Sequence, residues 1–278
     1  MKQSLVEMAV LVCPDDRGSL TRTDEVLRCQ SCGREFSATN AVWELLPVES
    51  LDDSSPEGQR LESYRAGYSQ RPDQAWLQFG RVLIAELGNA YLYAWASRAI
   101  EAVAGGRPLR ILDAACGDGM LWRHLSTRHH YVGSDFSARP LARASRYHPA
   151  EYFRADLNRL PFASESFDLV VTLQALQYLE HPERAVDEIH RVLRRGGHFL
   201  LSVPNDNSFK YRRQGVPAAQ LCRFRRETMV GLLSRGFHSL QLEAHGFWLP
   251  MPRVTVHLPG RYSDLRGLSW AAVSVRDP

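Results

Sequence analysis

One short stretch, residues 109–119, constrains the fold of this chain more than any other. It opens with an apolar run whose length suits a buried parallel strand. Asp113 ends that run, Gly117 and Gly119 follow, and a helical apolar pattern begins at Leu121. A strand, a glycine turn and a helix in this order are typical of the nucleotide-binding corner of a doubly wound sheet, where ligands lie outside the carboxyl ends of the strands.

The glycine turn differs from that of a dinucleotide-binding protein. A dinucleotide site uses Gly-x-Gly-x-x-Gly, and Trp122 stands where the third glycine belongs. Asp113 before the turn suits a cationic ligand better than a phosphate. Residues 113–119 read Asp-x-Ala-x-Gly-x-Gly and resemble the first motif of the class I S-adenosylmethionine-dependent methyltransferases, with Ala115 in place of the first glycine. The resemblance implies that S-adenosyl-L-methionine is the cofactor.

Acidic residues also follow the next two expected strands. The pattern predicts a strand over 131–135 that ends in Asp135, where a carboxylate can accept hydrogen bonds from ribose hydroxyls. A third strand over 151–155 is followed by Asp156 and Leu157. In the methyltransferase family, an acid at this position holds the adenine amino group and the next apolar residue lies against the ring. We therefore expect the adenosyl group to lie across these strand ends.

The remaining pattern predicts an α/β fold, with a doubly wound, mostly parallel sheet of seven strands. Further strands are expected over 167–172, 197–203, 238–244 and 269–275, and helices over 137–147, 182–194 and 227–235. The last strand is expected to be antiparallel. Residues 105–278 would form a Rossmann-like methyltransferase domain with substrate-facing insertions near 205–226 and 246–267.

Residues 1–47 are expected to form a small β-rich module. A strand is predicted over 9–13 and another over 26–29, and the segment Cys29-Gln-Ser-Cys32-Gly is a knuckle in which two thiolates can grip one metal ion. The module resembles the zinc ribbons that accompany some methyltransferases. Two interpretations remain open, namely a degenerate ribbon that folds without metal and a structural zinc site, whose ligands would be Cys13, Asp16, Cys29 and Cys32.

The segment between this module and the first strand has two parts. Residues 48–60 are polar and rich in Ser, Asp, Pro and Gly, as in a linker. Residues 61–104 carry aromatic residues at helical spacing and are expected to form a cap over the cofactor and substrate pocket. Tyr68 lies where related enzymes bring a tyrosine toward the cofactor, although simple helix packing also explains most of these aromatic side chains.

The resemblance implies a set of cofactor contacts gathered at the carboxyl ends of the strands and in the cap. These residues are Tyr68, Asp113, Ala115, Gly117, Gly119, Asp135, Phe136, Ser137, Asp156, Leu157, Leu173 and Gln174.

Catalysis of methyl transfer does not require a conspicuous side chain. Transfer from a sulfonium is an in-line displacement, and positioning together with exclusion of water can supply most of its rate. Tyr178 follows the fourth strand, at a place where many relatives have His, and is the first candidate for orienting the acceptor. His181 is a candidate base, but it precedes Pro182 at a helix start, where a capping or solvent-exposed role is also expected.

The expected strand 167–172 and the residues 173–179 that follow it resemble the fourth motif of the ubiquinone- and menaquinone-biosynthesis methyltransferases. This resemblance implies a small-molecule acceptor, methylated at oxygen, nitrogen or carbon in a biosynthetic pathway. One alternative is a ribosomal-RNA guanine methyltransferase, which also carries an N-terminal zinc finger. Another is a non-catalytic scaffold that keeps the fold. The net charge of +3 is small for an RNA-binding protein, and acids after three strands argue against a scaffold.

Cysteine usage and hydropathy give expectations about the compartment. The five cysteines are an odd number and include a Cys-x-x-Cys pair, which favours a reducing cytoplasm over a disulfide framework. No apolar run approaches the roughly 20 residues that a membrane-spanning helix needs. We therefore expect a cytoplasmic protein.

Overall fold

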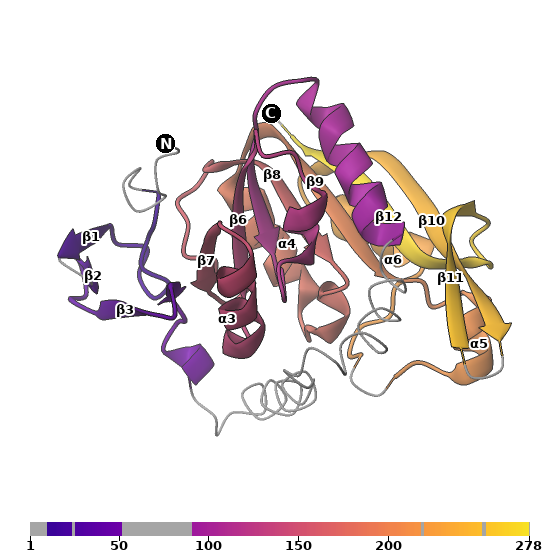
Figure 1. The fold of residues 1–278 in the computed structure, drawn as a ribbon, viewed down its shortest axis with the longest axis horizontal. Coiled ribbons are helices and arrows are strands. Elements are labelled where there is room, and N and C mark those ends of the chain that lie inside the picture. The colour runs from indigo at the N-terminus through magenta and orange to yellow at the C-terminus, as the bar shows by residue number, and fades with distance from the viewer. Residues whose placement is uncertain (1–9, 24–25, 52–90, 218–219, 252–253, 278) are drawn as a thin grey trace.

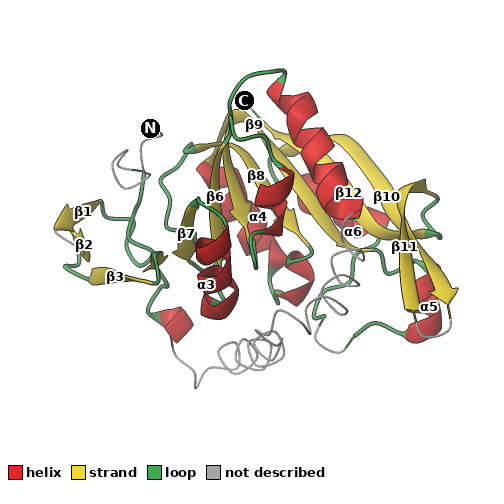
Figure 2. Cartoon of the chain, viewed as in Figure 1, coloured by secondary structure: helices red, strands yellow, loops and turns green. Residues whose placement is uncertain are grey.

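The chain is described here by a computed structural model that covers residues 10–23, 26–51, 91–217, 220–251 and 254–277. Within these residues the molecule is an α/β structure with one long twisted sheet (Figures 1 and 2). The N-terminal strands lie at one end of the long axis, and the hairpin made by the β10 and β11 strands lies at the other (Figure 1). No helix of the described residues is long and apolar enough to cross a membrane.

Five parallel strands form the centre of the sheet, in the order β7-β6-β5-β8-β9. Their bounds are β5 Arg110–Ala114, β6 His130–Asp135, β7 Glu151–Arg154, β8 Phe167–Leu173 and β9 Leu193–Pro204. All five match strands expected from the sequence. The order runs outward in both directions from β5, so the topological switch point lies between β5 and β8, where α/β proteins bind their ligands.

Buried side chains alternate between the two faces of these strands. In β5, Leu112 packs into the core under α4 (Pro182–Val192) and α6 (Arg226–Leu233), while Ile111 packs into the opposite core under the helix of residues 91–104. Helix α3 (Ala138–Tyr147) covers the β6 and β7 strands. Helices on both faces confirm the α/β class and the doubly wound arrangement.

The antiparallel end of the sheet is larger than expected. Strand β12 (Gly267–Arg276) pairs antiparallel with β9, as predicted, and β10 (Phe237–Met251) pairs antiparallel with β12. The stretch 246–267, expected as an insertion, takes the form of a β hairpin in which β11 (Val254–Tyr262) pairs with an extended β10. Prolines in this stretch concealed the hairpin, because proline is tolerated at sheet edges but weakens any strand prediction.

At the other edge, the N-terminal module continues the same sheet. Its strands are β1 Leu20–Thr23, β2 Val26–Cys29, β3 Glu35–Thr39 and β4 Val42–Glu44. Strand β4 pairs parallel with β7, so the sheet formed by the described residues has twelve strands rather than the seven expected. In the expected strand 9–13, the described residues form single bridges from Leu11 to Phe162 and from Val12 to Ser19 instead of a strand.

Short helices complete the described chain. They are the 3-10 helices η1 Glu49–Leu51, η2 Met120–His124 and η3 Leu176–Tyr178, and the helix α5 Phe209–Gln214. The first of these falls in the expected linker 48–60, and the second takes the place of the α-helix expected after the glycine turn. Residues 52–60 of the linker and 61–90 of the cap lie outside the described residues.

Candidate cofactor and metal sites

Asp135 ties together two of the segments expected to hold the cofactor. Its Oδ2 accepts a hydrogen bond of 2.9 Å from the backbone N–H of Gly117, and its Oδ1 accepts one of 2.8 Å from that of Ser137. Burial raises the pKa of this carboxyl, while these N–H donors act in the opposite direction. Ser137 stands at the N-cap of α3, but its side chain makes no capping hydrogen bond.

Asp113 lies beneath the glycine turn and is almost fully buried, with 3% of its surface exposed. Burial raises the pKa of its carboxyl to about 7, and the nearby Asp135 charge adds to the rise, while a 2.7 Å hydrogen bond from the Tyr131 hydroxyl opposes it. A carboxyl that titrates near neutrality is a common feature of functional sites. It can become a carboxylate when a cation arrives.

The turn between β5 and η2 uses backbone conformations that favour glycine. Ala115, Gly117 and Gly119 have φ of 73°, 54° and 72°. Ala115 therefore adopts the conformation that the usual glycine of this motif would adopt without strain. A Cβ atom on Gly119 would lie 2.9 Å from the Tyr152 hydroxyl and 3.1 Å from the Cβ of Ala144, so this glycine also allows η2 to pack against α3 and β7.

Residues 156–162, which follow β7, are called the adenine loop below. Asp156 Oδ2 accepts a 2.7 Å hydrogen bond from the Ser50 hydroxyl, and Oδ1 accepts a 2.8 Å bond from the backbone of Asn158. Leu157 is half-buried against the main core. Phe136, at the end of β6, offers its carbonyl to the Arg154 guanidinium at 3.0 Å.

Gln174 links the end of β8 to the antiparallel strands. Its φ is 57°, and its amide nitrogen donates to the Ser202 hydroxyl at 2.9 Å and to the Ser269 hydroxyl at 3.2 Å. Ser269 also exchanges a 2.9 Å hydrogen bond with the Tyr91 hydroxyl. Leu173, just before Gln174, packs against the second core. This polar network extends the carboxyl edge from β8 toward β12.

The two expected acceptor-side residues occupy different environments. Tyr178 is half-buried at the end of η3. His181 is exposed at the N-cap of α4, makes no capping hydrogen bond, and lies 3.1 Å from the Glu183 carboxylate. The geometry thus favours a surface role for His181. Tyr68 lies outside the described residues.

His245 is a feature that the sequence analysis missed. It lies on β10, opposite Ser269 of β12, and is 3% exposed. Its ring stacks on the Tyr91 ring, with the two centroids 6.4 Å apart. Its Nε2 lies 3.3 Å from Glu243 Oε1, while its Nδ1 has no hydrogen-bond partner in the described part of the chain. Burial lowers the pKa of the imidazole, and the Arg98 charge acts in the same direction. No motif signalled this residue, because its place depends on a β-bulge beside Gly246.

The four expected metal ligands come together in the N-terminal module. One ligand atom from each of Cys13, Asp16, Cys29 and Cys32 lies within 4.8 Å of the others. The sulfurs of Cys13 and Cys32 are 3.8 Å apart, and the Cys29 sulfur lies 3.4 and 3.6 Å from the Asp16 oxygens. A tetrahedral zinc with Zn–S bonds of about 2.3 Å separates two sulfurs by ~3.8 Å and a sulfur from an oxygen by ~3.5 Å.

The local environment of these ligands also fits a metal ion. The backbone N–H groups of Ser31 and Cys32 point to the Cys29 sulfur at 3.4 and 3.5 Å, as in a metal knuckle. Burial raises the pKa of the Cys13 thiol to about 12, so a thiolate there needs a compensating positive charge. The donor set therefore fits zinc.

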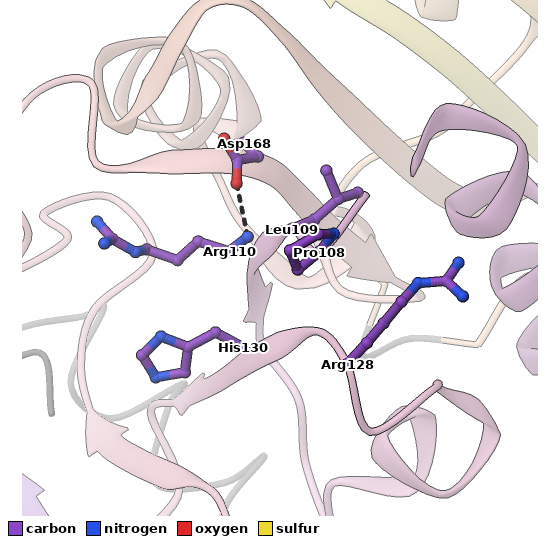
Figure 3. A pocket seen from close by; sticks show the side chains of 6 residues that line it. All are labelled: Pro108, Leu109, Arg110, Arg128, His130 and Asp168. Carbon is purple, nitrogen blue, oxygen red and sulfur yellow. Dashed lines mark hydrogen bonds between the residues drawn. The ribbon is translucent and has the colours of Figure 1, made fainter. Parts of the chain in front are cut away.

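A shallow pocket of about 420 Å³ lies at the opposite edge of the sheet (Figure 3). Arg110 and His130 begin β5 and β6 there, and the backbone N–H of Arg110 donates to Asp168 at 2.6 Å. The pocket is at the amino ends of the parallel strands, whereas the acids and the glycine turn stand at the carboxyl ends. It is therefore separate from the candidate cofactor site.

The central part of the chain matches the model of a known protein family. Residues 112–201 match the family model described as a methyltransferase domain. This segment is therefore similar to a methyltransferase domain. It contains the glycine turn and the ends of β6, β7 and β8.

Curated relatives give the same result over part of their length. The chain is 41% identical over 90 residues to a malonyl-[acyl-carrier protein] O-methyltransferase from Enterobacter lignolyticus, covering 32% of this chain and 36% of the relative. It is 34% identical over 154 residues to a demethylmenaquinone methyltransferase from Clavibacter sepedonicus, covering 49% of this chain and 60% of the relative. The chain thus spans less than two thirds of the length of these relatives.

Solved structures support the fold alone. An S-adenosylmethionine-dependent methyltransferase from Thermotoga maritima superposes with a TM-score of 0.50 at 18% identity, over 73% of this chain and 96% of that one. A protein of Bacillus halodurans classed among the methyltransferases gives a TM-score of 0.52 at 16% identity, over 66% of this chain and 99% of that one. The described α/β fold is therefore similar to the folds of these two proteins.

Proposed function

We propose that this protein transfers a methyl group from S-adenosyl-L-methionine to a small-molecule acceptor in a biosynthetic pathway. The observation that carries the proposal is the position of Asp135, whose carboxylate binds the glycine turn through Gly117 and the start of α3 through Ser137. Acidic residues follow or end three neighbouring strands at this edge. The names of the matched relatives, which include O-methyltransferases and a demethylmenaquinone methyltransferase, support the same reaction class.

Each group at the edge has a role in this proposal. The cofactor supplies an electrophilic methyl group on a sulfonium. Asp135 would accept hydrogen bonds from the ribose hydroxyls, and Asp156 and Leu157 would hold the adenine. Asp113, whose pKa of about 7 lets it ionise, offers a negative charge to the cationic methionine end. The conformations of Ala115 and Gly117 let the backbone approach the ligand closely.

The acceptor is proposed to bind between η3 and the β10–β12 strands. Tyr178 orients it, and the hydrogen-bonded network of Gln174, Ser269 and Tyr91 shapes the wall beside it. Within this wall, the Nδ1 atom of His245 has no hydrogen-bond partner among the described residues. Burial favours the neutral form of the imidazole, and the lone pair of that form can take a proton from a hydroxyl or amine of the acceptor.

The segment 205–226 lies next to this region and carries exposed cationic side chains. Arg212, Arg213 and Arg223 are exposed, and Arg226 lies 3.7 Å from the Asp264 carboxylate. We propose that this segment favours an acceptor with an anionic group. Ribosomal RNA remains a second substrate for the acceptor screen below.

The N-terminal module is proposed to hold a structural zinc ion. The support is that the four ligand atoms of Cys13, Asp16, Cys29 and Cys32 lie within 4.8 Å of one another, and that the Cys13–Cys32 and Cys29–Asp16 distances match those of a tetrahedral site. None of the five cysteines forms a disulfide, so we propose that the protein works in a reducing compartment, the cytoplasm.

The experiment that tests the function combines binding with product analysis. Purified protein is titrated with S-adenosylmethionine and S-adenosylhomocysteine, and is then incubated with S-adenosylmethionine and pools of small metabolites. We expect micromolar binding and a product heavier by one methyl group. Binding of neither ligand would contradict the proposal, and transfer to ribosomal RNA alone would replace the acceptor class.

A further inference from the structure

We propose that the metal ion of the N-terminal module sets the affinity of the cofactor site. The segment 13–18, called the ligand loop, supplies Cys13 and Asp16 to the metal cluster and also supports the adenine loop 156–162. Metal binding and cofactor binding are therefore linked through one piece of backbone. This inference rests on the proposed function, because it requires that the adenine loop binds the cofactor.

The backbone just before the ligand loop pairs with the far end of the adenine loop. The N–H of Val12 donates to the carbonyl of Pro161 at 3.0 Å, and the N–H of Ala163 donates to the carbonyl of Val10 at 2.8 Å. Cys13, the first metal ligand, comes directly after Val12 and is fully buried. A change at the metal therefore acts on a residue adjacent to this pairing.

Arg17, within the ligand loop, holds the middle of the adenine loop. Its guanidinium donates to the carbonyl of Leu160 at 2.6 Å and pairs with Glu188 on α4 at 2.7 Å. Glu188 in turn accepts a 2.9 Å hydrogen bond from the N–H of Leu160. Both backbone polar groups of Leu160 thus contact this ion pair, which adjoins the metal ligand Asp16. Arg191 on α4 shares the task, because it also donates to the Leu160 carbonyl, at 3.0 Å, and pairs with Glu188.

Asp15 connects the ligand loop to Asp156 through a second route. Its carboxylate pairs with Arg34 and accepts a 2.8 Å hydrogen bond from the N–H of Val48, and its carbonyl accepts from Arg159 in the adenine loop. Two residues after Val48, the Ser50 hydroxyl donates to Asp156 Oδ2. The orientation of the carboxylate expected to bind adenine therefore depends on where the ligand loop places Val48.

The metal ion would fix the ligand loop in the position that supports the adenine loop. A structural zinc ion contributes its binding free energy to the folding of the segment that ligates it. Without the ion, the cluster keeps weak contacts such as that of the Cys29 thiol with Asp16 at 3.4 Å. By thermodynamic reciprocity, the cofactor must then raise the affinity for the metal by the same factor by which the metal raises the affinity for the cofactor.

The test compares S-adenosylhomocysteine binding to the zinc-loaded protein and to the metal-free variant Cys29→Ser, with zinc content measured by elemental analysis. We expect the metal-free variant to bind about tenfold more weakly or worse, within the usual range of coupling between two sites. A second measurement uses the intact protein and follows the release of zinc to a chromogenic pyridylazo chelator. Saturating S-adenosylhomocysteine should slow that release.

A matched pair of serine variants tests the route itself. Ser50→Ala removes the hydrogen bond to Asp156, and we expect about fivefold weaker S-adenosylhomocysteine binding at full zinc content. Ser145→Ala is the control, because it removes a 3.0 Å hydrogen bond from α3 to the carbonyl of Asn40 in the same module, away from the adenine loop. The control should leave the affinity unchanged.

The outcomes separate this inference from the proposed function. If the zinc-loaded protein does not bind S-adenosylhomocysteine, the proposed function fails and the inference fails with it. If it binds, but metal-free protein binds within twofold of the same affinity, the inference alone is overturned. If Cys29→Ser does not fold, the chelator measurement decides, and zinc release unchanged by the ligand overturns the inference.

Discussion

Removal of the Asp135 carboxylate is the substitution expected to weaken cofactor binding most. Its two oxygens accept hydrogen bonds of 2.9 and 2.8 Å from Gly117 and Ser137, and each keeps a second lone pair for a ribose hydroxyl. A hydrogen bond to a charged acceptor contributes about 1.5–3 kcal/mol. Loss of two such bonds in Asp135→Ala corresponds to ~3–6 kcal/mol, or a dissociation constant raised by roughly 10² to 10⁴.

The assay is calorimetric titration of wild-type and variant proteins with S-adenosylhomocysteine. Asp135→Asn keeps the shape of the side chain and one oxygen acceptor. The affinity of this variant for S-adenosylhomocysteine should therefore lie between those of the wild type and Asp135→Ala, about 10- to 100-fold below the wild type. Asp168→Asn is the control, since it removes the same charge at the amino edge of the sheet. The reasoning is refuted if Asp135→Ala keeps its fold by circular dichroism and binds within threefold of the wild type.

Four further predictions follow from the site. Because the pKa of Asp113 is about 7 in the free protein, S-adenosylhomocysteine should bind about tenfold more tightly at pH 8 than at pH 6, and Asp113→Asn should abolish this dependence. In the ligand-free protein, the same raised pKa adds to the free energy of unfolding. This contribution is complete below pH 3.8 and is lost as the pH rises through about 7, and urea unfolding at several pH values across this range measures it. Ala115→Gly relieves the φ of 73° and should raise the free energy of unfolding by about 0.5–1 kcal/mol, so a lower melting temperature would contradict the backbone assignment. His245→Gln should slow methyl transfer by about 10² while leaving S-adenosylhomocysteine affinity within twofold, and unchanged transfer would exclude a proton-accepting role.

The central sheet could be predicted because its signals are local. Apolar runs of strand length, each followed by an acid or a glycine turn, mark the ends of β5, β6 and β7, and topology alone brings these ends to one edge. The same local logic located the cluster of candidate metal ligands, since the spacing of Cys29 and Cys32 defines a knuckle before any fold is known.

The features that escaped prediction depend on contacts between distant segments. The pairing of β4 with β7 joins strands that are more than a hundred residues apart, and nothing in a three-residue strand specifies that partner. His245 has no motif around it, and its burial depends on stacking with Tyr91 from the helix before β5. The hydrogen bond from Ser50 to Asp156 also joins segments that are far apart in the sequence. For this reason, the sequence does not predict that the N-terminal module supports the adenine loop.

The most direct test of the account is a crystal structure of the zinc-loaded protein with S-adenosylhomocysteine. The account predicts the ribose hydroxyls within hydrogen-bond distance of Asp135, the adenine beside Asp156 and Leu157, and the amino group of the methionine end near Asp113. A ligand bound instead in the pocket at Arg110 and His130, or density for it nowhere along the carboxyl edge, would contradict the central claim.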